Sequence, residues 1–260
     1  MTEKTEKTWK AIGGVTGGLA ALIAIIVFLT GKTSLPEFFS TSPTTTIAAP
    51  TITQVGTNPT DPTTGVRQQL AVGDTTHFGQ YDWRVLDVQD GKVLLLSEDI
   101  IEQLPYNTDW IAVTWETCSL RAYLNGAFYE SFSEADRARI ALTRNENPNN
   151  TWGTWDSKRF NTPGGNSTDD YIFLLSVPDI LKHFPGLKLH KNSDWGEEWL
   201  YEADERLMAK FKDDKSSWWL RSPGIDSMCA AHVGDNGGVS LGGLPSPIED
   251  GVRPALWLNL

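Results

Sequence analysis

Cysteine is nearly absent from this sequence. Cys118 and Cys229 are the only two in 260 residues, which is too few for a scaffold held together by disulfides. The fold must therefore rest on a hydrophobic core. The sequence leaves two interpretations of the thiols open: a disulfide that closes a long loop in an oxidising compartment, or two small buried side chains.

Basic residues are also few. The chain has 22 Lys and Arg against 33 Asp and Glu, a formal net charge of −11, and within residues 70–260 the balance is 17 against 29. Such a surface repels a phosphate backbone, so we expect no nucleic-acid partner.

The common catalytic motifs are missing as well. The sequence contains no Gly-x-Ser-x-Gly, no His-Glu-x-x-His and no EF-hand spacing. Adjacent carboxylates such as Asp169 and Asp170 diverge on regular structure, and we interpret them as solvated charges. The four histidines occur in unlike contexts and are interpreted as surface or satisfied core residues: His77, His183, His190 and His232. These absences argue against an enzyme.

One long stretch of the chain carries no charge. From Ala11 to Gly31 there is no Asp, Glu, Lys or Arg, and at about 1.5 Å per residue this run matches the hydrocarbon core of a bilayer. We predict a single-pass transmembrane helix at residues 11–31 of a cell-membrane protein. Lysines precede the run, so the positive-inside rule places a tail at residues 1–10 in the cytoplasm and the rest of the chain outside.

Two alternatives accompany the membrane helix. A cleaved signal peptide is the rival interpretation, although Thr30-Gly31-Lys32 is a poor cleavage site. Gly13/Gly17 and Gly14/Gly18 have the Gly-x-x-x-Gly spacing that allows close approach of membrane helices. They indicate either a homodimer through this helix or the ordinary abundance of small residues in such segments.

Residues 32–69 differ in composition from both neighbours. Between residues 33 and 69 the chain contains 11 Thr, 5 Pro and 3 Ser. Such a stretch buries too little apolar surface to offset the entropy of ordering it. We therefore predict a disordered Thr/Pro-rich stalk that carries a single folded domain at residues 70–260.

The folded domain is predicted to be α+β. Alternating residues at 83–88, the turn Asp90-Gly91 and the apolar run 92–97 indicate a hairpin. Capping residues Thr114 and Ser133 indicate helices at 114–125 and 133–142. Further short elements are expected as helices at 177–184 and 203–211, and as strands at 172–176, 218–221, 229–233, 238–241 and 252–258. The stretch 143–170 lacks periodicity and is predicted to be a long loop.

Several segments resemble a bacterial domain family of unknown function. They run in order through most of residues 70–260 and are Tyr81–Val88, Pro105–Thr108, Thr114–Asn125, Ile172–Ser176, Trp218-Trp219-Leu220-Arg221-Ser222-Pro223-Gly224 and Gly251-Val252-Arg253-Pro254-Ala255-Leu256-Trp257-Leu258. The final strands are similar to the C-type-lectin-like fold of formylglycine-generating enzymes and of retroelement variable proteins. That resemblance implies short antiparallel strands, a few short helices, and a ligand surface built by loops before the last strand.

The loop region 226–250 is therefore the candidate site. Its candidate ligand-binding residues are Asp226, His232, Asp235, Asn236 and the neighbouring Trp219. Oxygen ligands for Ca²⁺ are available there, and the metal candidates are Asp226, Asp235, Asn236, Glu249 and Asp250. The alternative is a plain hairpin turn at Asp235-Asn236-Gly237-Gly238.

The sequence favours one function over two others. We expect a membrane-anchored extracytoplasmic module that recognises a glycan, a cell-wall polymer or a protein. The alternatives are a metal-dependent oxidase of the formylglycine-generating type, which would need Cys118 and Cys229 close together, and a scaffold for envelope assembly.

Overall fold

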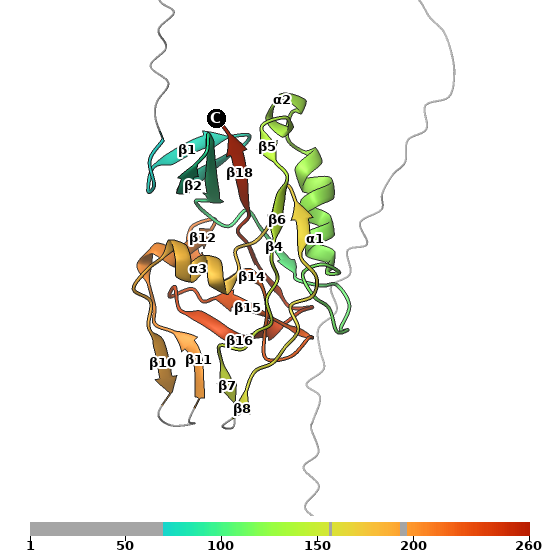
Figure 1. Ribbon diagram of the computed structural model, residues 1–260, viewed down its shortest axis with the longest axis vertical. Coiled ribbons are helices and arrows are strands. Elements are labelled where there is room, and N and C mark those ends of the chain that lie inside the picture. The colour runs from blue at the N-terminus through green and yellow to red at the C-terminus, as the bar shows by residue number, and fades with distance from the viewer. Residues whose placement is uncertain (1–69, 156–157, 193–196) are drawn as a thin grey trace, which may run out of the picture. The chain divides into compact units, whose positions relative to one another are not determined.

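The computed structural model describes residues 70–155, 158–192 and 197–260 (Figure 1). The predicted cytoplasmic tail, the transmembrane helix at residues 11–31 and the stalk at 32–69 lie outside these residues. Within the described residues, no helix combines the length and the apolar character needed to cross a membrane.

The predicted α+β class is wrong, because the described residues are mostly β, with 41% in strands and 15% in helices. The segment expected as a helix at 203–211 shows why. It forms one 3₁₀ turn, Glu205–Leu207, and then strand β12 (Ala209–Phe211), which pairs with β13 (Asp214–Ser216). Lys212 turns the chain between them with φ of 59°. Cross-strand pairing thus overrides a helical pattern of only nine residues.

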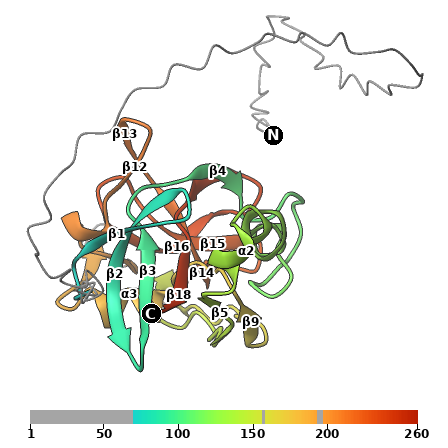
Figure 2. The ribbon, with the colours of Figure 1, turned by 90° about the horizontal axis from the view of Figure 1, so that it is seen from above.

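The first sheet has the strand order β1-β2-β3-β18-β5. The hairpin predicted around Asp90-Gly91 is confirmed, since both residues have positive φ, 48° and 74°, as a tight hairpin turn requires. Figure 2 shows this hairpin beside β18, which carries the C-terminus. The strands are β1 (Thr75–Phe78), β2 (Tyr81–Gln89), β3 (Lys92–Ser97), β18 (Ala255–Asn259) and β5 (Ile140–Ala141).

The second sheet has the order β10-β11-β16-β15-β14-β17-β4. All its pairs are antiparallel except β14 with β17, which are parallel at Trp218 and Gly251. Its strands are β10 (Leu189–Asn192), β11 (Glu197–Tyr201), β16 (Val239–Pro245), β15 (Cys229–Val233), β14 (Trp218–Pro223), β17 (Glu249–Val252) and β4 (Glu102–Pro105).

The strand predicted at 252–258 is in fact two strands in two different sheets, β17 and β18. Arg253 lies between them and is fully buried. Its guanidinium donates to the carbonyls of Ser97, Glu98 and Leu207 and lies 5.0 Å from the Trp218 ring. Burial lowers the pKa of Arg253 to about 10. The buried arginine thus joins the two sheets.

The long loop predicted at 143–170 contains short strands. They form two small ribbons, β6 (Thr143–Asn145) with β9 (Thr168–Asp170), and β7 (Thr154–Trp155) with β8 (Lys158–Arg159). The strand expected at 172–176 is reduced to one bridge between Phe173 and Ala255. Its apolar residues are buried nonetheless, so burial rather than pairing explains the apolar run.

The α-helices are short. α1 (Ser119–Tyr123) continues into a π-helical turn (Leu124–Phe128). Its N-cap is Cys118, whose thiol accepts from the Arg121 amide at 3.4 Å, and not Thr114 as predicted. α2 (Glu134–Arg137) has the predicted Ser133 cap but ends before β5. α3 (Val177–His183) forms as predicted, with a complete capping box between Ser176 and Asp179.

Candidate functional site

The structure separates the residues predicted to form the loop site. Asp226 precedes β15, and Asp235 and Asn236 follow it, so the length of that strand, about 17 Å at 3.3 Å per residue, lies between them. Asn236 Oδ1 accepts from the Gly238 amide at 2.9 Å, and Gly237 has φ of 81°. The hairpin-turn interpretation of Asp235-Asn236-Gly237-Gly238 therefore describes this segment.

Two of the predicted residues do meet, from strands β15 and β17 on either side of β14. His232 Nδ1 lies 3.3 Å from Asp250 Oδ2, and the Asp250 carboxylate, 3% exposed, also accepts from the Ser217 hydroxyl and from the Gly251 amide. Glu249 is exposed at the start of β17. Among the described residues, no three His, Cys, Asp or Glu side chains are placed to hold a metal ion.

Trp219 lies in the core rather than on the loop surface. Its side chain is fully buried, and its indole N–H donates to the Leu104 carbonyl at 2.8 Å. Trp218, on the opposite face of β14, is fully buried as well and donates to the Leu207 carbonyl at 3.0 Å. Two successive side chains on opposite faces of β14 are thus both in the core, because the second sheet is covered on both faces.

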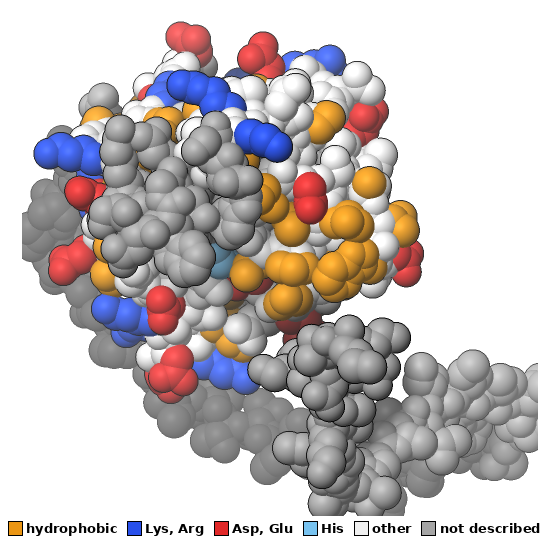
Figure 3. Space-filling model, turned by 90° about the horizontal axis from the view of Figure 1, so that it is seen from below, with side chains coloured by type: hydrophobic (Ala, Val, Ile, Leu, Met, Phe, Trp, Pro, Cys, Tyr) orange, Lys and Arg blue, Asp and Glu red, His pale blue; other side chains and the backbone are white. Residues whose placement is uncertain are grey.

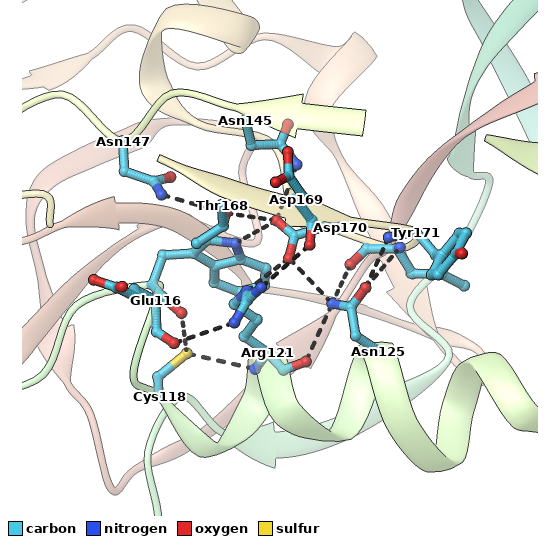
Figure 4. A network of polar contacts seen from close by, with 12 residues as sticks. Glu116, Cys118, Arg121, Asn125, Asn145, Asn147, Thr168, Asp169, Asp170 and Tyr171 are labelled. Atoms are coloured by element: carbon cyan, nitrogen blue, oxygen red, sulfur yellow. Dashed lines mark hydrogen bonds and ion pairs between the residues drawn. The ribbon is translucent and has the colours of Figure 1, made fainter. Parts of the chain in front are cut away.

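A buried carboxylate that the sequence did not reveal is Asp170, shown at the centre of Figure 4. It was interpreted as solvated, but it is fully buried. Its oxygens accept hydrogen bonds from five side chains: Arg121 Nε at 2.6 Å, Thr168 Oγ1 at 2.7 Å, Trp115 Nε1 at 3.0 Å, Asn145 Nδ2 at 3.0 Å and Asn125 Nδ2 at 3.5 Å.

The Asp170 network holds α1 against the β6–β9 ribbon. Arg121 and Asn125 rise from one face of the helix toward Asp170 (Figure 4), four residues apart as a helical face requires. Asn125 also accepts from the Tyr171 amide and donates to the Ile172 carbonyl, both at 2.8 Å. Every acceptor site of the carboxylate is occupied, so its role is to position α1. The signal in the sequence was the polar i, i+4 spacing of Arg121 and Asn125.

Both cysteines are free thiols, so the disulfide interpretation is wrong. Burial raises the pKa of Cys118 to about 12. Burial and the neighbouring Asp226 raise the pKa of Cys229 to about 11. Neither environment favours the thiolate that nucleophilic or metal chemistry needs.

Three loops carry exposed apolar side chains. The residues are Trp110, Ile111, Met228 and Ile248, with exposed fractions of 63%, 54%, 36% and 45%. Figure 3, which views the molecule from below, shows that hydrophobic side chains gather on one side of the face it draws. We call these four residues the loop surface. Two of its loops belong to the predicted 226–250 region, and the third, around Trp110, was missed.

Backbone hydrogen bonds hold the three loops together. The Val113 amide donates to the Ser227 carbonyl at 2.8 Å, the Asn107 amide to the Ser246 carbonyl at 3.0 Å, and the Ser246 amide to the Met228 carbonyl at 2.8 Å. The Asn107 side chain adds a bond to the Asp109 carbonyl at 2.9 Å. The loop surface is therefore presented on a fixed backbone.

Comparison with known proteins adds a family but no activity. The profile of a family described as Domain of unknown function (DUF6273) matches residues 90–260. No curated protein matches the chain. No solved structure matches it either, so the resemblance to the C-type-lectin-like fold gains no support from this comparison.

Proposed function

Because the chain belongs to the DUF6273 family, whose description assigns no activity, we propose a function from the geometry. The domain is a non-catalytic recognition module that binds a partner protein through the loop surface. The observation that carries the proposal is the exposure of Trp110, a residue with a large apolar side chain that is 63% exposed. The predicted membrane anchor at residues 11–31 remains a prediction on which this proposal does not depend.

The composition of the loop surface supports a protein partner. Trp and Met are enriched in protein interfaces, and exposed apolar side chains that gather in one patch mark interaction sites. The side chains of Ile111 and Ile248 offer no hydrogen bonds to sugar hydroxyls, and Trp110 offers only its indole N–H. Sugar binding would need polar groups around the tryptophan, whereas a desolvated apolar anchor suits a protein interface.

The fixed backbone under the loop surface also supports recognition. Loops that are already ordered lose little conformational entropy when they bind. The hydrogen bonds that join the three loops run from the backbone amides of Val113, Asn107 and Ser246 to backbone carbonyls, so they do not involve the exposed side chains. Changes to those side chains therefore leave the framework intact, which makes the proposal testable by substitution.

The test is quantitative affinity enrichment with the full chain. A variant with Trp110→Ser and Ile248→Ser is compared with the unaltered protein, and each bound protein is quantified and then confirmed as a purified pair. We expect at least one partner whose affinity falls about 100-fold in the variant, since a buried aromatic anchor contributes about 2–4 kcal/mol.

The control is Leu142→Ser, which removes an equally exposed apolar side chain, 56% accessible, outside the loop surface. Melting temperatures of both variants should stay within about 2 °C of the unaltered protein, because exposed positions contribute little to stability. A confirmed partner that binds all three proteins alike refutes the proposed surface. Binding to a glycan array that depends on Trp110, with no protein partner, refutes the proposed class of ligand.

A further inference from the structure

A second site lies away from the loop surface, in a cavity where both sheets, α3 and the start of the 143–170 segment meet. The cavity has a volume of about 290 Å³, close to the lower limit for pockets that hold small molecules. Phe173, Arg221 and Trp257, which lie in three of the segments that resemble the family, contribute to its lining. Figure 1 shows α3 in front of β14 at this place.

Arg221 supplies a buried cation with unused donors. Its side chain is 5% exposed. Nη1 donates to the Leu174 carbonyl at 2.7 Å and to Asp179 Oδ2, and Nη2 makes one long contact of 3.4 Å to the Glu146 carbonyl. Nε is buried and has no partner among the described residues. A guanidinium has five N–H donors, so the Nε and Nη2 edge retains capacity for an acceptor.

Asp179 does not use that capacity. The carboxylate already accepts from Arg221 Nη1, from the Ser176 amide at 2.9 Å and from the Ser176 hydroxyl at 2.8 Å. Burial alone would raise the pKa of Asp179, but Arg221 and the Ser176 donors outweigh it and lower the pKa. Asp179 is thus held ionised in the α3 capping box, and it fixes one end of the guanidinium.

The mouth of the cavity carries two more cations. Lys182 lies 3.5 Å from Asp87, and Arg144 lies 3.1 Å from Asp169. Both cationic side chains are about 60% exposed, so these ion pairs are weak and exchange readily for another anion. Glu146 is the second carboxylate of the lining. Three Lys and Arg against two Asp and Glu give this cavity a positive balance within an acidic domain.

An aromatic wall completes the cavity. Trp257 is half-buried, and no hydrogen bond to its indole N–H occurs in the part of the chain that the structure describes. The Arg221 guanidinium lies over the Phe173 ring, 5.7 Å from the ring centre. This cation–π contact helps to fix the position of the guanidinium. A ligand with a flat or ring-shaped body would contact Trp257 while its charged group meets the cations.

We propose that this cavity binds a small organic carboxylate with a ring, whose carboxylate is held by Arg221 with Lys182 and Arg144 and whose ring lies against Trp257. Arginine suits a planar carboxylate because two parallel N–H donors match its two oxygens. The site is independent of the loop surface and shares no residue with it.

The test is titration of the full chain with glucuronate and benzoate, each beside a neutral counterpart of the same ring, glucose and benzyl alcohol. Inorganic phosphate forms a fifth arm. The readouts are the calorimetric Kd and the ¹⁵N–¹H resonance of the Trp257 indole, assigned by its loss in Trp257→Phe. We expect at least one acid to bind with a Kd of about 1 mM or tighter and to shift that resonance, with neither neutral counterpart doing so.

Two variants locate the charge. Lys182→Gln with Arg144→Gln changes only exposed side chains, so the protein folds, and we expect about fivefold weaker binding of the acid. Lys92→Gln, an exposed lysine elsewhere, leaves the Kd unchanged. Arg221→Lys removes the planar donor edge, and we expect it to abolish binding. If this buried substitution also lowers stability, the variant with Lys182→Gln and Arg144→Gln still tests the proposal, because it changes only exposed side chains.

Three results overturn the proposal. One is the absence of any response to either acid up to about 10 mM. Another is an equal response to an acid and to its neutral counterpart, which makes the ring rather than the charge the ligand. The third is phosphate binding at least as tight as either acid, which replaces the carboxylate by a phosphate as the recognised group.

Discussion

Asp170 shows how much one side chain organises. Its carboxylate is fully buried and accepts from Arg121, Trp115, Thr168 and two asparagines. Three of these donors come from the segment 115–125 and two from the β6–β9 ribbon. A buried charge of this kind is tolerated only because every acceptor position is occupied.

We predict that Asp170→Asn destabilises the domain by about 3–5 kcal/mol, because it leaves the Arg121 charge without its partner and turns one acceptor into a donor that faces other donors. Urea denaturation of the variant and of the unaltered protein measures the change in the free energy of unfolding. Asp169→Asn is the matched control, since the Asp169 side chain is 53% exposed and, among the described residues, pairs only with Arg144. That control should cost less than about 1 kcal/mol. Equal losses in the two variants contradict the assignment.

The same pair of residues marks a limit of inference from sequence. Asp169 and Asp170 are identical in type and adjacent, and nothing local tells which one is buried. The distinction depends on Trp115 and Arg121, about 50 residues away, and on where α1 packs. Trp218 and Trp219 repeat the lesson, because alternation along a strand distinguishes two faces but does not tell that both faces are covered.

Among the elements, the hairpin of β15 and β16 was predicted in part. β15 has the expected bounds, Cys229–Val233, and β16 runs beyond the expected end to Pro245. The extension depends on Gly243, which has φ of 75° and approaches the Ala230 carbonyl so closely that a Cβ there would lie 2.0 Å from its oxygen.

We predict that Gly243→Ala destabilises the domain by about 1–3 kcal/mol more than Gly91→Ala. Both glycines have nearly the same positive φ, 75° and 74°, but a Cβ at Gly91 meets nothing within 4 Å. The control therefore measures the backbone cost of about 1–2 kcal/mol, and the difference measures the clash with the neighbouring strand. Thermal denaturation of both variants is the measurement. A smaller loss at Gly243 than at Gly91 contradicts the close approach.

Elements defined by local signals were predictable, and those defined by distant partners were not. Asp90-Gly91 and the Ser176 cap act within a few residues, so the β2–β3 hairpin and α3 formed as expected. The sequence at 252–258 did not indicate that this run divides into two strands. The division arises because β17 pairs with β4 and β18 pairs with β3, strands about 150 residues earlier that belong to different sheets. The 226–250 region does not form one site, since β15 holds Asp226 apart from Asp235 and Asn236.

For the whole molecule, the two thiols sit in unlike surroundings, one inside the core and one at its edge. Cys118 is 2% exposed and caps α1, whereas Cys229 is half-buried at the start of β15 beside Asp226. Raised pKa values of about 12 and about 11 leave both thiols protonated at neutral pH. Their reactivity therefore reports how the domain opens.

We predict that a thiol-alkylating reagent at about pH 7.5 labels Cys229 more slowly than it labels a free cysteine, whose pKa is about 8.5, because little thiolate is present. Cys118 should react only through opening of the α1 region. Its labelling rate should therefore follow the unfolding equilibrium as urea is added. Mass spectrometry of the labelled peptides separates the two sites. Labelling of Cys118 in native buffer at the rate of Cys229 contradicts its burial.

The position of β18 determines how long the edge of β3 stays unpaired during synthesis. β18 lies inside the first sheet, between β3 and β5, and it pairs with β3 across more than 150 residues of chain. The hairpin of β2 and β3 emerges early, but its apolar face and the pairing edge of β3 stay uncovered until residues 255–259 have been made. During that interval the nascent chain presents an unpaired strand edge, so the hairpin is vulnerable to aggregation until β18 covers β3.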